Sequence, residues 1–330
     1  SGDKATGYGL KDKLLFKNSI KYLQSLQQPF YAKYITVTNH FPYTLDDEDK
    51  DPNFQTTNTG DSNVDNYFVT AHYLDQSIQE FFNYLQKTGL DKKSIIMIYG
   101  DHYGISNSEN TSLASVLGKS ADDWTDFDNA QLQRVPLMFV IPGTGHGKVY
   151  HTYGGEVDVL PTLLHLLGIS SKRYIQFGTD LFSSKHNQVV AFRNRDFVTP
   201  TYTSVGGTIY SNKTGKEAKL TKKQQEKLKK DQEFVNEELT LSDSLNEKNL
   251  LRFYHPKGFK NVNPADYNYS NGLKRAQRIE KKKGIKSTSI YSENGDRSTV
   301  DDYSTDAPEQ NHSSTDSNRI KITNPDANNK

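Results

Sequence analysis

The feature that most constrains this chain is a long amphipathic segment between residues 62 and 88. Its apolar side chains recur at steps of three and four residues, the period of one face of an α-helix. They are Val64, Tyr67, Phe68, Ala71, Leu74, Ile78, Phe81, Phe82 and Leu85. Asp61 or Ser62 can cap the start, and Gly89 follows the end. A helix of this kind is marginal alone in water, so we expect it to pack against a sheet or other helices.

Segments rich in β-branched and aromatic residues surround this helix. Residues 30–38 (FYAKYITVT) and 94–99 (SIIMIY) predict strands on either side of it, and residues 135–141 (VPLMFVI) predict a third. The 94–99 segment is apolar at consecutive positions, which favours a strand that is buried on both faces. Residues 157–167 predict a further helix. This order indicates an α/β fold with a mostly parallel sheet sandwiched by helices.

The chain changes character after about residue 187. Two alternating segments around Gly206 and Gly207 predict an antiparallel hairpin, and residues 214–245 predict a charged helix. We therefore divide the chain into an α/β domain (1–186), a small C-terminal α+β subdomain (187–272) and a basic, then polar tail (273–330). The tail carries too few apolar residues to offset its ordering entropy, so we expect disorder there, above all in residues 287–330.

Polar, ionisable residues follow two of the predicted strands. His40 comes after residues 30–38, and Asp101 and His102 come after residues 94–99. A helical crossover between two strands makes them parallel, so these three residues should meet at one edge of the sheet, where open α/β folds bind ligands. A carboxylate and a neutral imidazole suit Mn²⁺ or Zn²⁺ better than Ca²⁺. The pair Asp101 and His102 is thus a candidate metal site.

Each of these residues also has a purely structural interpretation. Asp101 can cap a helix beside a surface histidine, and His40 can be a loop histidine that bonds to the backbone; spacing alone does not separate the two interpretations. His72 and His165 lie on predicted helices next to apolar residues, which favours structural roles. The lysine clusters of the C-terminal third are typical of solvated faces, with contact to anionic lipid or polymer as the alternative.

Composition excludes several classes of protein. The chain has 330 residues and no cysteine, which rules out disulfides, thiol catalysis and cysteine-based zinc sites. Its 41 basic and 40 acidic residues give a net charge of +1, so a generally basic nucleic-acid binder is excluded. No run of about 18 apolar residues is present.

Six motifs, in this order, resemble the extracellular catalytic domain of lipoteichoic acid synthases, which are polyglycerol-phosphate transferases of the alkaline phosphatase/sulfatase superfamily. The motifs are ITVTNHFPYTL, IIMIYGDHYGIS, RVPLMFVIPG, GGEVDVLPTLLHLLGI, FGTDLFS and HNQVVAFRN. The resemblance covers about residues 7–270. It implies an alkaline phosphatase/sulfatase-like fold in which residues 1–186 are the C-terminal part of the catalytic domain, with its N-terminal part missing.

The resemblance also implies a chemistry. The family transfers glycerol phosphate from phosphatidylglycerol to a chain on a glycolipid, through a phospho-threonine intermediate at a Mn²⁺ site. Its metal-binding Asp-His maps to Asp101 and His102, and its substrate-binding histidine maps to His40. Mn²⁺ is the implied cofactor, with Mg²⁺ as a substitute. The nucleophilic threonine and a metal-binding glutamate are expected upstream, so we assign no nucleophile to this chain and expect it to be inactive alone.

The implied partners are phosphatidylglycerol and glycolipid-anchored polyglycerol phosphate at a membrane surface, with no nucleic acid and with the chain a monomer. The implied location is the extracellular face of a Gram-positive membrane, with transmembrane helices upstream of this chain or release by cleavage. Two alternatives stay open. One is another superfamily member, a sulfatase, phosphodiesterase or phosphatase. The other is a non-catalytic surface module that binds anionic polymer.

Overall fold

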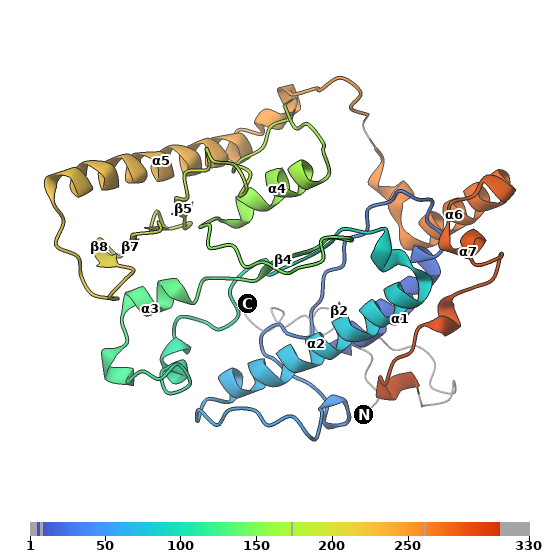
Figure 1. The fold of residues 1–330 in the computed structure, drawn as a ribbon, viewed down its shortest axis with the longest axis horizontal. Helices are drawn as coiled ribbons and strands as arrows, with labels where there is room; N and C mark the ends of the chain where they lie inside the picture. Colours follow the sequence, from blue (N-terminus) through green and yellow to red (C-terminus); the bar gives the residue numbers. More distant parts are fainter. Residues whose placement is uncertain (1–4, 7–8, 173, 261, 311–330) are drawn as a thin grey trace, which may run out of the picture.

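The computed structural model describes residues 5–6, 9–172, 174–260 and 262–310 (Figure 1). Its strands are β1 (Ala5–Thr6), β2 (Gly9–Leu10), β3 (Ile96–Tyr99), β4 (Leu137–Val140), β5 (Val190–Ala191), β6 (Phe197–Val198), β7 (Tyr202–Val205) and β8 (Thr208–Ser211). Its α-helices are α1 (Asp12–Leu23), α2 (Ser62–Thr88), α3 (Asp126–Gln131), α4 (Val159–Leu166), α5 (Lys222–Glu247), α6 (Tyr269–Lys283) and α7 (Ile290–Glu293). Short 3₁₀ turns connect several of them.

Helix α2 confirms the amphipathic helix predicted from the sequence. The Asp61 carboxylate accepts hydrogen bonds from the N–H groups of Asn63 and Val64, and Gly89 ends the helix in the left-handed conformation at φ 73°. The N-terminal half packs in a cluster with Ile105 and Leu113. The C-terminal half packs against α1, which the sequence analysis did not predict. The shared core holds Phe16, Ile20, Leu23, Tyr84, Leu85, Leu90, Ile290 and Tyr303.

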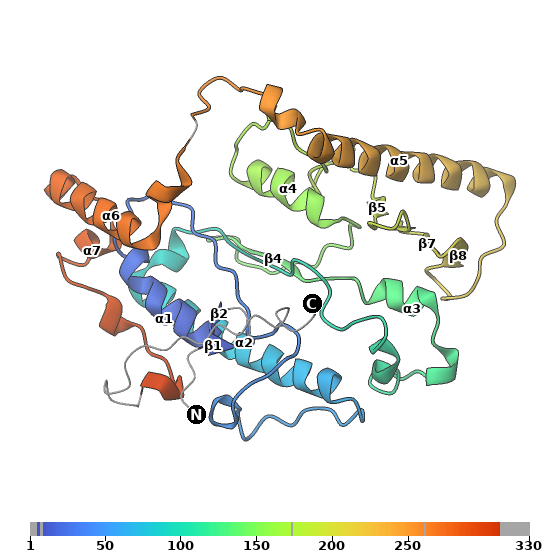
Figure 2. The same cartoon turned by 180° about the vertical axis from the view of Figure 1, so that it is seen from behind.

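Strands β3 and β4 confirm two of the three strands predicted for the α/β domain. They pair antiparallel, with Ile96 opposite Val140 and Tyr99 opposite Leu137. Among the described residues every strand pair is antiparallel, so the parallel pairing that we expected is not seen in this part of the chain. In both views of the ribbon, β4 runs between α2 and α4 (Figures 1 and 2), and its Met138 and Val140 side chains are exposed on one face.

The strand predicted at residues 30–38 is wrong. This segment is not a strand in the structure, and its side chains at Tyr31 and Ile35 are largely exposed. β-branched and aromatic residues favour an extended backbone, but a strand also needs a hydrogen-bonded neighbour. No described strand pairs with residues 30–38.

The predicted hairpin is confirmed and belongs to a four-stranded antiparallel sheet in the order β5-β6-β7-β8. Gly206 and Gly207 make the β7–β8 turn with φ angles of 59° and 80°, which glycine adopts without strain. Helix α5 confirms the predicted charged helix, and its buried Val235 packs with Phe197 of β6. The predicted helix at 157–167 is also confirmed, as α4.

The expected disorder of the C-terminal tail is wrong for its described residues. Residues 273–283 lie in helix α6, and residues 287–310 form a segment that lies on the core. This segment, which we call the C-terminal strap, packs on α1 and α2 and buries Ile290, Tyr303 and Ala307. Its Glu309 carboxylate binds the buried Lys11 ammonium at 2.7 Å. The sequence did not predict this packing because the segment is mostly polar. A few apolar side chains and the buried ion pair with Lys11 hold the strap on the fold. Residues 311–330 lie outside the described residues, and the domain boundaries stay a prediction.

Candidate functional site

His40 and His102 lie side by side. Their ring centroids are 5.7 Å apart and the rings are perpendicular, although the residues are 62 positions apart in the sequence. His102 follows β3, and His40 lies in a turn that the Tyr43 N–H closes by donating to the His40 carbonyl at 2.8 Å. The predicted convergence of His40 with Asp101 and His102 is therefore present, even though the segment before His40 is not a strand.

Side chains from α2 hold the two loops together. The Thr70 hydroxyl of α2 donates to the Asn39 side-chain oxygen at 2.8 Å, which fixes the residue before His40. The Tyr43 hydroxyl donates to the Gly104 carbonyl, so the His40 turn is bonded to the loop after β3. A Cβ at Gly104 would lie 2.4 Å from the Tyr67 ring, so only glycine allows this close approach.

The start of α1 fixes the backbone that leads to His40. The buried Asp12 carboxylate accepts from the N–H groups of Val37, at 2.9 Å, and Thr38. In return the Asp12 N–H donates to the Thr38 hydroxyl at 3.0 Å. Burial raises the pKa of Asp12, and the bonds from Val37 and Thr38 oppose that rise. The sequence analysis missed Asp12, because nothing in the sequence links it to residues 25 positions away.

Backbone carbonyls select one tautomer of each histidine. The His40 Nδ1 lies 2.8 Å from the Phe41 carbonyl oxygen, and the His102 Nδ1 lies 2.7 Å from that of Tyr103. A carbonyl only accepts, so each Nδ1 carries the proton in these bonds and each Nε2 is left as the basic nitrogen. The His102 Nε2 is 3.8 Å from an Asp101 carboxylate oxygen.

This arrangement fits part of a divalent-metal site. A histidine that binds a metal through one ring nitrogen usually donates the N–H of the other ring nitrogen to a carbonyl or carboxylate. The His102 Nδ1–H donates to the Tyr103 carbonyl in this way. The Asp101 and His102 side chains are 75% and 55% exposed, so both can be reached by a ligand from solvent. Within the described ranges no three His, Asp or Glu side chains gather closely enough to hold a metal ion. The described residues thus offer one oxygen and one nitrogen ligand, a pair that suits Mn²⁺ or Zn²⁺, but not a full set.

Lys33 adds positive charge beside this pair. A hydrogen bond with the Tyr99 side chain raises the pKa of Lys33, and the nearby Asp101 carboxylate adds to this rise. Like any solvent-exposed lysine, Lys33 is charged at neutral pH, so it adds positive charge near Asp101. The sequence analysis did not single out Lys33. It is the only lysine in the apolar and aromatic segment 30–38, and we interpreted that whole segment as a strand.

The other two candidate histidines have structural partners. The His72 Nε2 lies 3.0 Å from the Asp51 carboxylate, and its ring stacks on Phe54 with centroids 4.2 Å apart. His165 on α4 pairs with Asp180 at 2.8 Å. Both observations agree with the structural interpretation made from the sequence.

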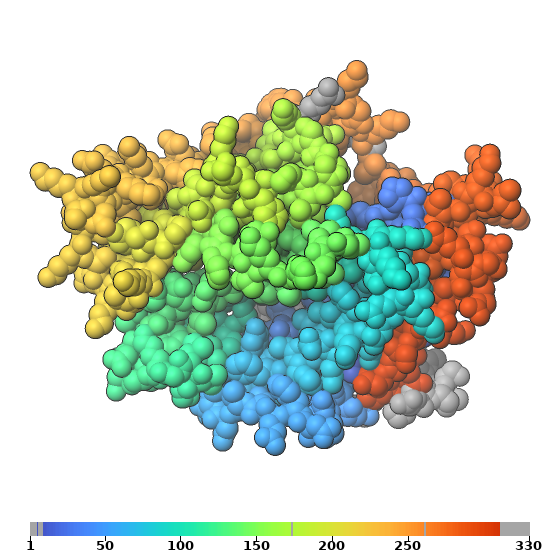
Figure 3. Space-filling model, viewed as in Figure 1, coloured from blue at the N-terminus to red at the C-terminus, as the bar shows by residue number. Residues whose placement is uncertain are grey.

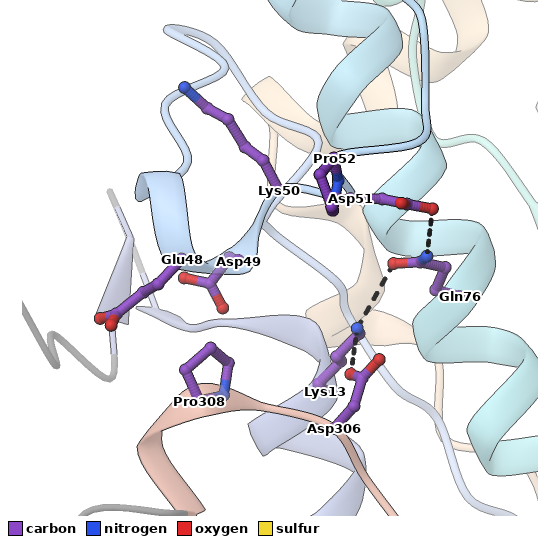
Figure 4. Close-up of a pocket in the computed structure, with 9 residues that line it drawn as sticks. All are labelled: Lys13, Glu48, Asp49, Lys50, Asp51, Pro52, Gln76, Asp306 and Pro308. Atoms are coloured by element: carbon purple, nitrogen blue, oxygen red, sulfur yellow. Dashed lines mark hydrogen bonds and ion pairs between the residues drawn. The ribbon is translucent and has the colours of Figure 1, made fainter.

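A polar cavity of about 340 Å³ lies apart from these loops, between α1, the 3₁₀ turn at Asp47–Asp49, α2 and the C-terminal strap (Figure 4). Lys13 points into it, and its ammonium donates to the Gln76 side-chain oxygen on α2 and to the Asp306 carboxylate of the C-terminal strap. His40, Asp101 and His102 do not line this cavity. Three of its charged residues already have partners, Lys13 in Asp306, Asp49 in Lys11 and Asp51 in His72. The candidate chemistry therefore stays with His40, Asp101 and His102.

The fold and the site together define an α/β protein of the sulfatase type. The sulfatase family model matches residues 2–169, just over half of the chain, and the chain belongs to this family. None of the described helices is both long and apolar enough to cross a membrane.

The relatives in sequence are lipoteichoic acid synthases. Lipoteichoic acid synthase 2 of Bacillus subtilis is 53% identical over 268 residues, which are 81% of this chain and 40% of the relative. The lipoteichoic acid synthase of Staphylococcus aureus (strain NCTC 8325 / PS 47) is 45% identical over 274 residues, 83% of this chain and 41% of the relative. The chain therefore spans about two fifths of the length of these relatives.

Two solved structures share the fold. The lipoteichoic acid synthase LtaP from Listeria monocytogenes aligns with a TM-score of 0.64 and 24% identity, over 78% of this chain and 63% of that one. A protein of the alkaline phosphatase superfamily from Vibrio parahaemolyticus aligns with a TM-score of 0.53 and 16% identity, over 77% and 59%. These matches confirm the predicted alkaline phosphatase/sulfatase-like α/β fold class.

Proposed function

We propose that the intact protein builds the polyglycerol-phosphate backbone of lipoteichoic acid. In this reaction it transfers glycerol phosphate from phosphatidylglycerol to a chain held on a glycolipid. The observation that carries the proposal is the convergence of His40, Asp101 and His102 in a chain that is 53% identical to a lipoteichoic acid synthase.

The proposed reaction has two displacement steps. A threonine hydroxyl, supplied by a part of the protein outside these 330 residues, attacks the phosphorus of phosphatidylglycerol. The bond to diacylglycerol breaks, and diacylglycerol leaves with the proton. A terminal glycerol hydroxyl of the growing chain then attacks the phospho-threonine and restores the threonine. A covalent intermediate of this kind lets one site use two substrates in turn.

The described residues have distinct tasks in this proposal. Asp101 and His102 supply two ligands to Mn²⁺, with Mg²⁺ as a substitute, and the ion would neutralise the phosphoryl oxygens. His40 contacts the glycerol-phosphate group through its Nε2, since its Nδ1 is bonded to Phe41. Lys33 adds a positive charge that favours the anionic substrate. Phosphoryl transfer depends mainly on such positioning and charge neutralisation.

The substrates are lipids or lipid-anchored polymers, so the proposed place of action is a membrane surface. We propose the extracellular face of a Gram-positive cell membrane, with the chain as a monomer. We also propose that these 330 residues have no transferase activity without the part that carries the threonine.

The test is turnover by the intact protein, measured as release of fluorescent diacylglycerol from labelled phosphatidylglycerol with Mn²⁺ present. His40→Ala and Asp101→Asn should each lower kcat/KM by at least about 100-fold, since each removes a group at the phosphoryl centre. His165→Ala is the matched control, because this histidine pairs with Asp180 outside the site. Unchanged turnover by either site variant would refute the assigned roles.

Metal binding is tested separately by isothermal titration of Mn²⁺. Asp101→Asn replaces a charged ligand by a neutral amide, so Mn²⁺ affinity should fall at least about tenfold while the circular dichroism spectrum is preserved. Equal affinity of the Asp101→Asn variant and the parent protein would show that Asp101 is not a ligand.

A further inference from the structure

Helix α6 presents a strongly basic face to solvent. Lys274, Arg278 and Lys281 recur at steps of four and three residues and so lie on one side of the helix. Residues 269–286 contain seven basic residues and one acidic residue, Glu280. The exposed basic side chains are Lys274, Arg275, Arg278, Lys281, Lys282, Lys283 and Lys286.

The opposite side of α6 is attached to the rest of the fold. The Glu280 carboxylate accepts from the Gln27 side-chain amide at 2.7 Å and from the Ser287 hydroxyl at 2.7 Å. The Tyr269 ring contacts the Tyr22 ring of α1 with centroids 5.7 Å apart. The helix lies at one end of the molecule in both ribbon views (Figures 1 and 2), and its side chains form an outer edge of the surface in Figure 3. Its basic face is therefore held outward.

The charges of this face are not balanced by neighbouring acids. Across the described ranges none of the seven basic side chains lies within ion-pair distance of an Asp or Glu. Helix α5 differs, because its five lysines are outnumbered by seven acidic residues. Two of those lysines form pairs along the helix, Lys227 with Asp231 and Lys229 with Glu233. The basic face of α6 is thus available to an external anion.

Apolar and aromatic side chains accompany the charges. Ile285, in the 3₁₀ turn that follows α6, is fully exposed. Tyr267, just before the helix, is also exposed, and the Arg275 guanidinium lies over its ring at 5.0 Å. A soluble anionic polymer would gain nothing from an exposed isoleucine, whereas the interface of a bilayer accepts apolar and aromatic side chains beneath a layer of phosphates.

We propose that α6 and Ile285 dock on the surface of an anionic phospholipid bilayer. The basic side chains would lie among the lipid phosphates, and Ile285 would enter the headgroup region. This inference deepens the proposed function, which needs a lipid surface, but it rests on its own observations of charge and exposure. Each Lys or Arg near an anionic bilayer strengthens binding by about fivefold.

The experiment is co-sedimentation of the 330-residue chain with phosphatidylcholine vesicles that contain about 30 mol% phosphatidylglycerol. The variant Lys274→Gln/Arg278→Gln/Lys281→Gln/Lys282→Gln should bind at least about 100-fold more weakly, since it removes four basic residues, and pure phosphatidylcholine should bind neither protein. The matched control, Lys222→Gln/Lys223→Gln/Lys229→Gln/Lys230→Gln in α5, removes the same charge and should change binding less than about threefold. Equal losses from the two quadruple variants, or none from α6, would overturn the proposal.

A second variant separates a bilayer from a soluble polyanion. Ile285→Ser should weaken vesicle binding several-fold and leave binding of soluble polyphosphate unchanged. Vesicle binding that does not change in Ile285→Ser would assign α6 to a polyanion and overturn the bilayer proposal. His165→Ala, which changes a histidine outside the catalytic residues, should bind vesicles like the parent chain. Vesicle binding reports docking and turnover reports catalysis, so a failure of one proposal would leave the result for the other intact.

Discussion

Glu309 offers a sharp test of the C-terminal strap, because it is the strap's contact with a buried charge. The Lys11 ammonium donates to Asp46 at 2.7 Å, to Asp49, and to Glu309 at 2.7 Å. The Lys11 and Glu309 side chains are only 2% and 1% exposed. These bonds raise the pKa of Lys11 against the opposing effect of desolvation by burial. We expect Glu309→Gln, which removes the charge and keeps the shape, to destabilise the fold.

The expected loss follows from what remains around Lys11. Removing one partner of a buried ion pair costs about 3–5 kcal/mol when the other charge is left alone. Here Asp46 and Asp49 still accept from Lys11, so the loss should approach that of one charged hydrogen bond, about 2 kcal/mol. Lys11→Met leaves the buried Asp49 and Glu309 without their cation, so it should cost about 3–5 kcal/mol.

Urea denaturation followed by circular dichroism measures these losses. Glu293→Gln is the control, because Glu293 lies in the same strap but forms a half-exposed pair with Lys93, worth about 0–1 kcal/mol. With m near about 3 kcal/mol/M, Glu309→Gln should lower the midpoint by about 0.7 M at an unchanged m. If its midpoint matched that of Glu293→Gln, the strap would not be part of the cooperative fold.

Two further predictions concern backbone geometry and pH. A Cβ at Gly178 (φ +75°) would lie 2.2 Å from the Val157 carbonyl oxygen, so Gly178→Ala should lower the free energy of unfolding by about 2–3 kcal/mol in thermal unfolding. The control Gly168→Ala, where nothing lies within 4 Å of the new Cβ, should cost about 1 kcal/mol, and similar losses from the two variants would contradict the close approach. Burial raises the pKa of Tyr43 to about 12, so the folded state keeps a phenol proton that the unfolded chain loses near pH 10, and the free energy of unfolding should fall as pH rises from about 10 to 12. Measured by urea unfolding across that range, the free energy of unfolding should fall less steeply with pH for Tyr43→Phe than for the parent chain. Equal slopes for the two proteins would disprove this linkage.

Local periodicity was enough to predict the elements whose apolar residues lie close together in the sequence. Helix α2, strands β3 and β4, helix α4 and the β7–β8 hairpin all follow from spacing within about 30 residues. The same signal was present for α1, where Phe16, Ile20 and Leu23 recur at steps of four and three and are buried. We missed α1 because lysines separate those residues, and the long side chain of Lys11 or Lys13 normally marks a solvated face rather than a buried one.

The strap and the support of the site could not be predicted in this way. Ile290 and Tyr303 are isolated apolar residues in a polar sequence, and their partners lie on α1 and α2, more than 200 positions earlier. The bonds from Asp12 to residues 37 and 38 are likewise fixed by the tertiary fold. The order of polar residues along the chain predicted that His40 and His102 converge, but the loops that bring them together only appear with the fold.

The contact between Lys11 and Glu309 has a consequence for synthesis of the chain. The two residues are 298 positions apart, so the ribosome completes Lys11 long before its third carboxylate exists. At about 5–20 residues per second the interval is roughly 15 to 60 s. During that time the nascent α1 has Asp46 and Asp49 within reach but not the strap that covers it. Translation that stops short of residue 309 would thus release a chain in which α1 keeps its packing on α2 but Lys11 lacks its third carboxylate.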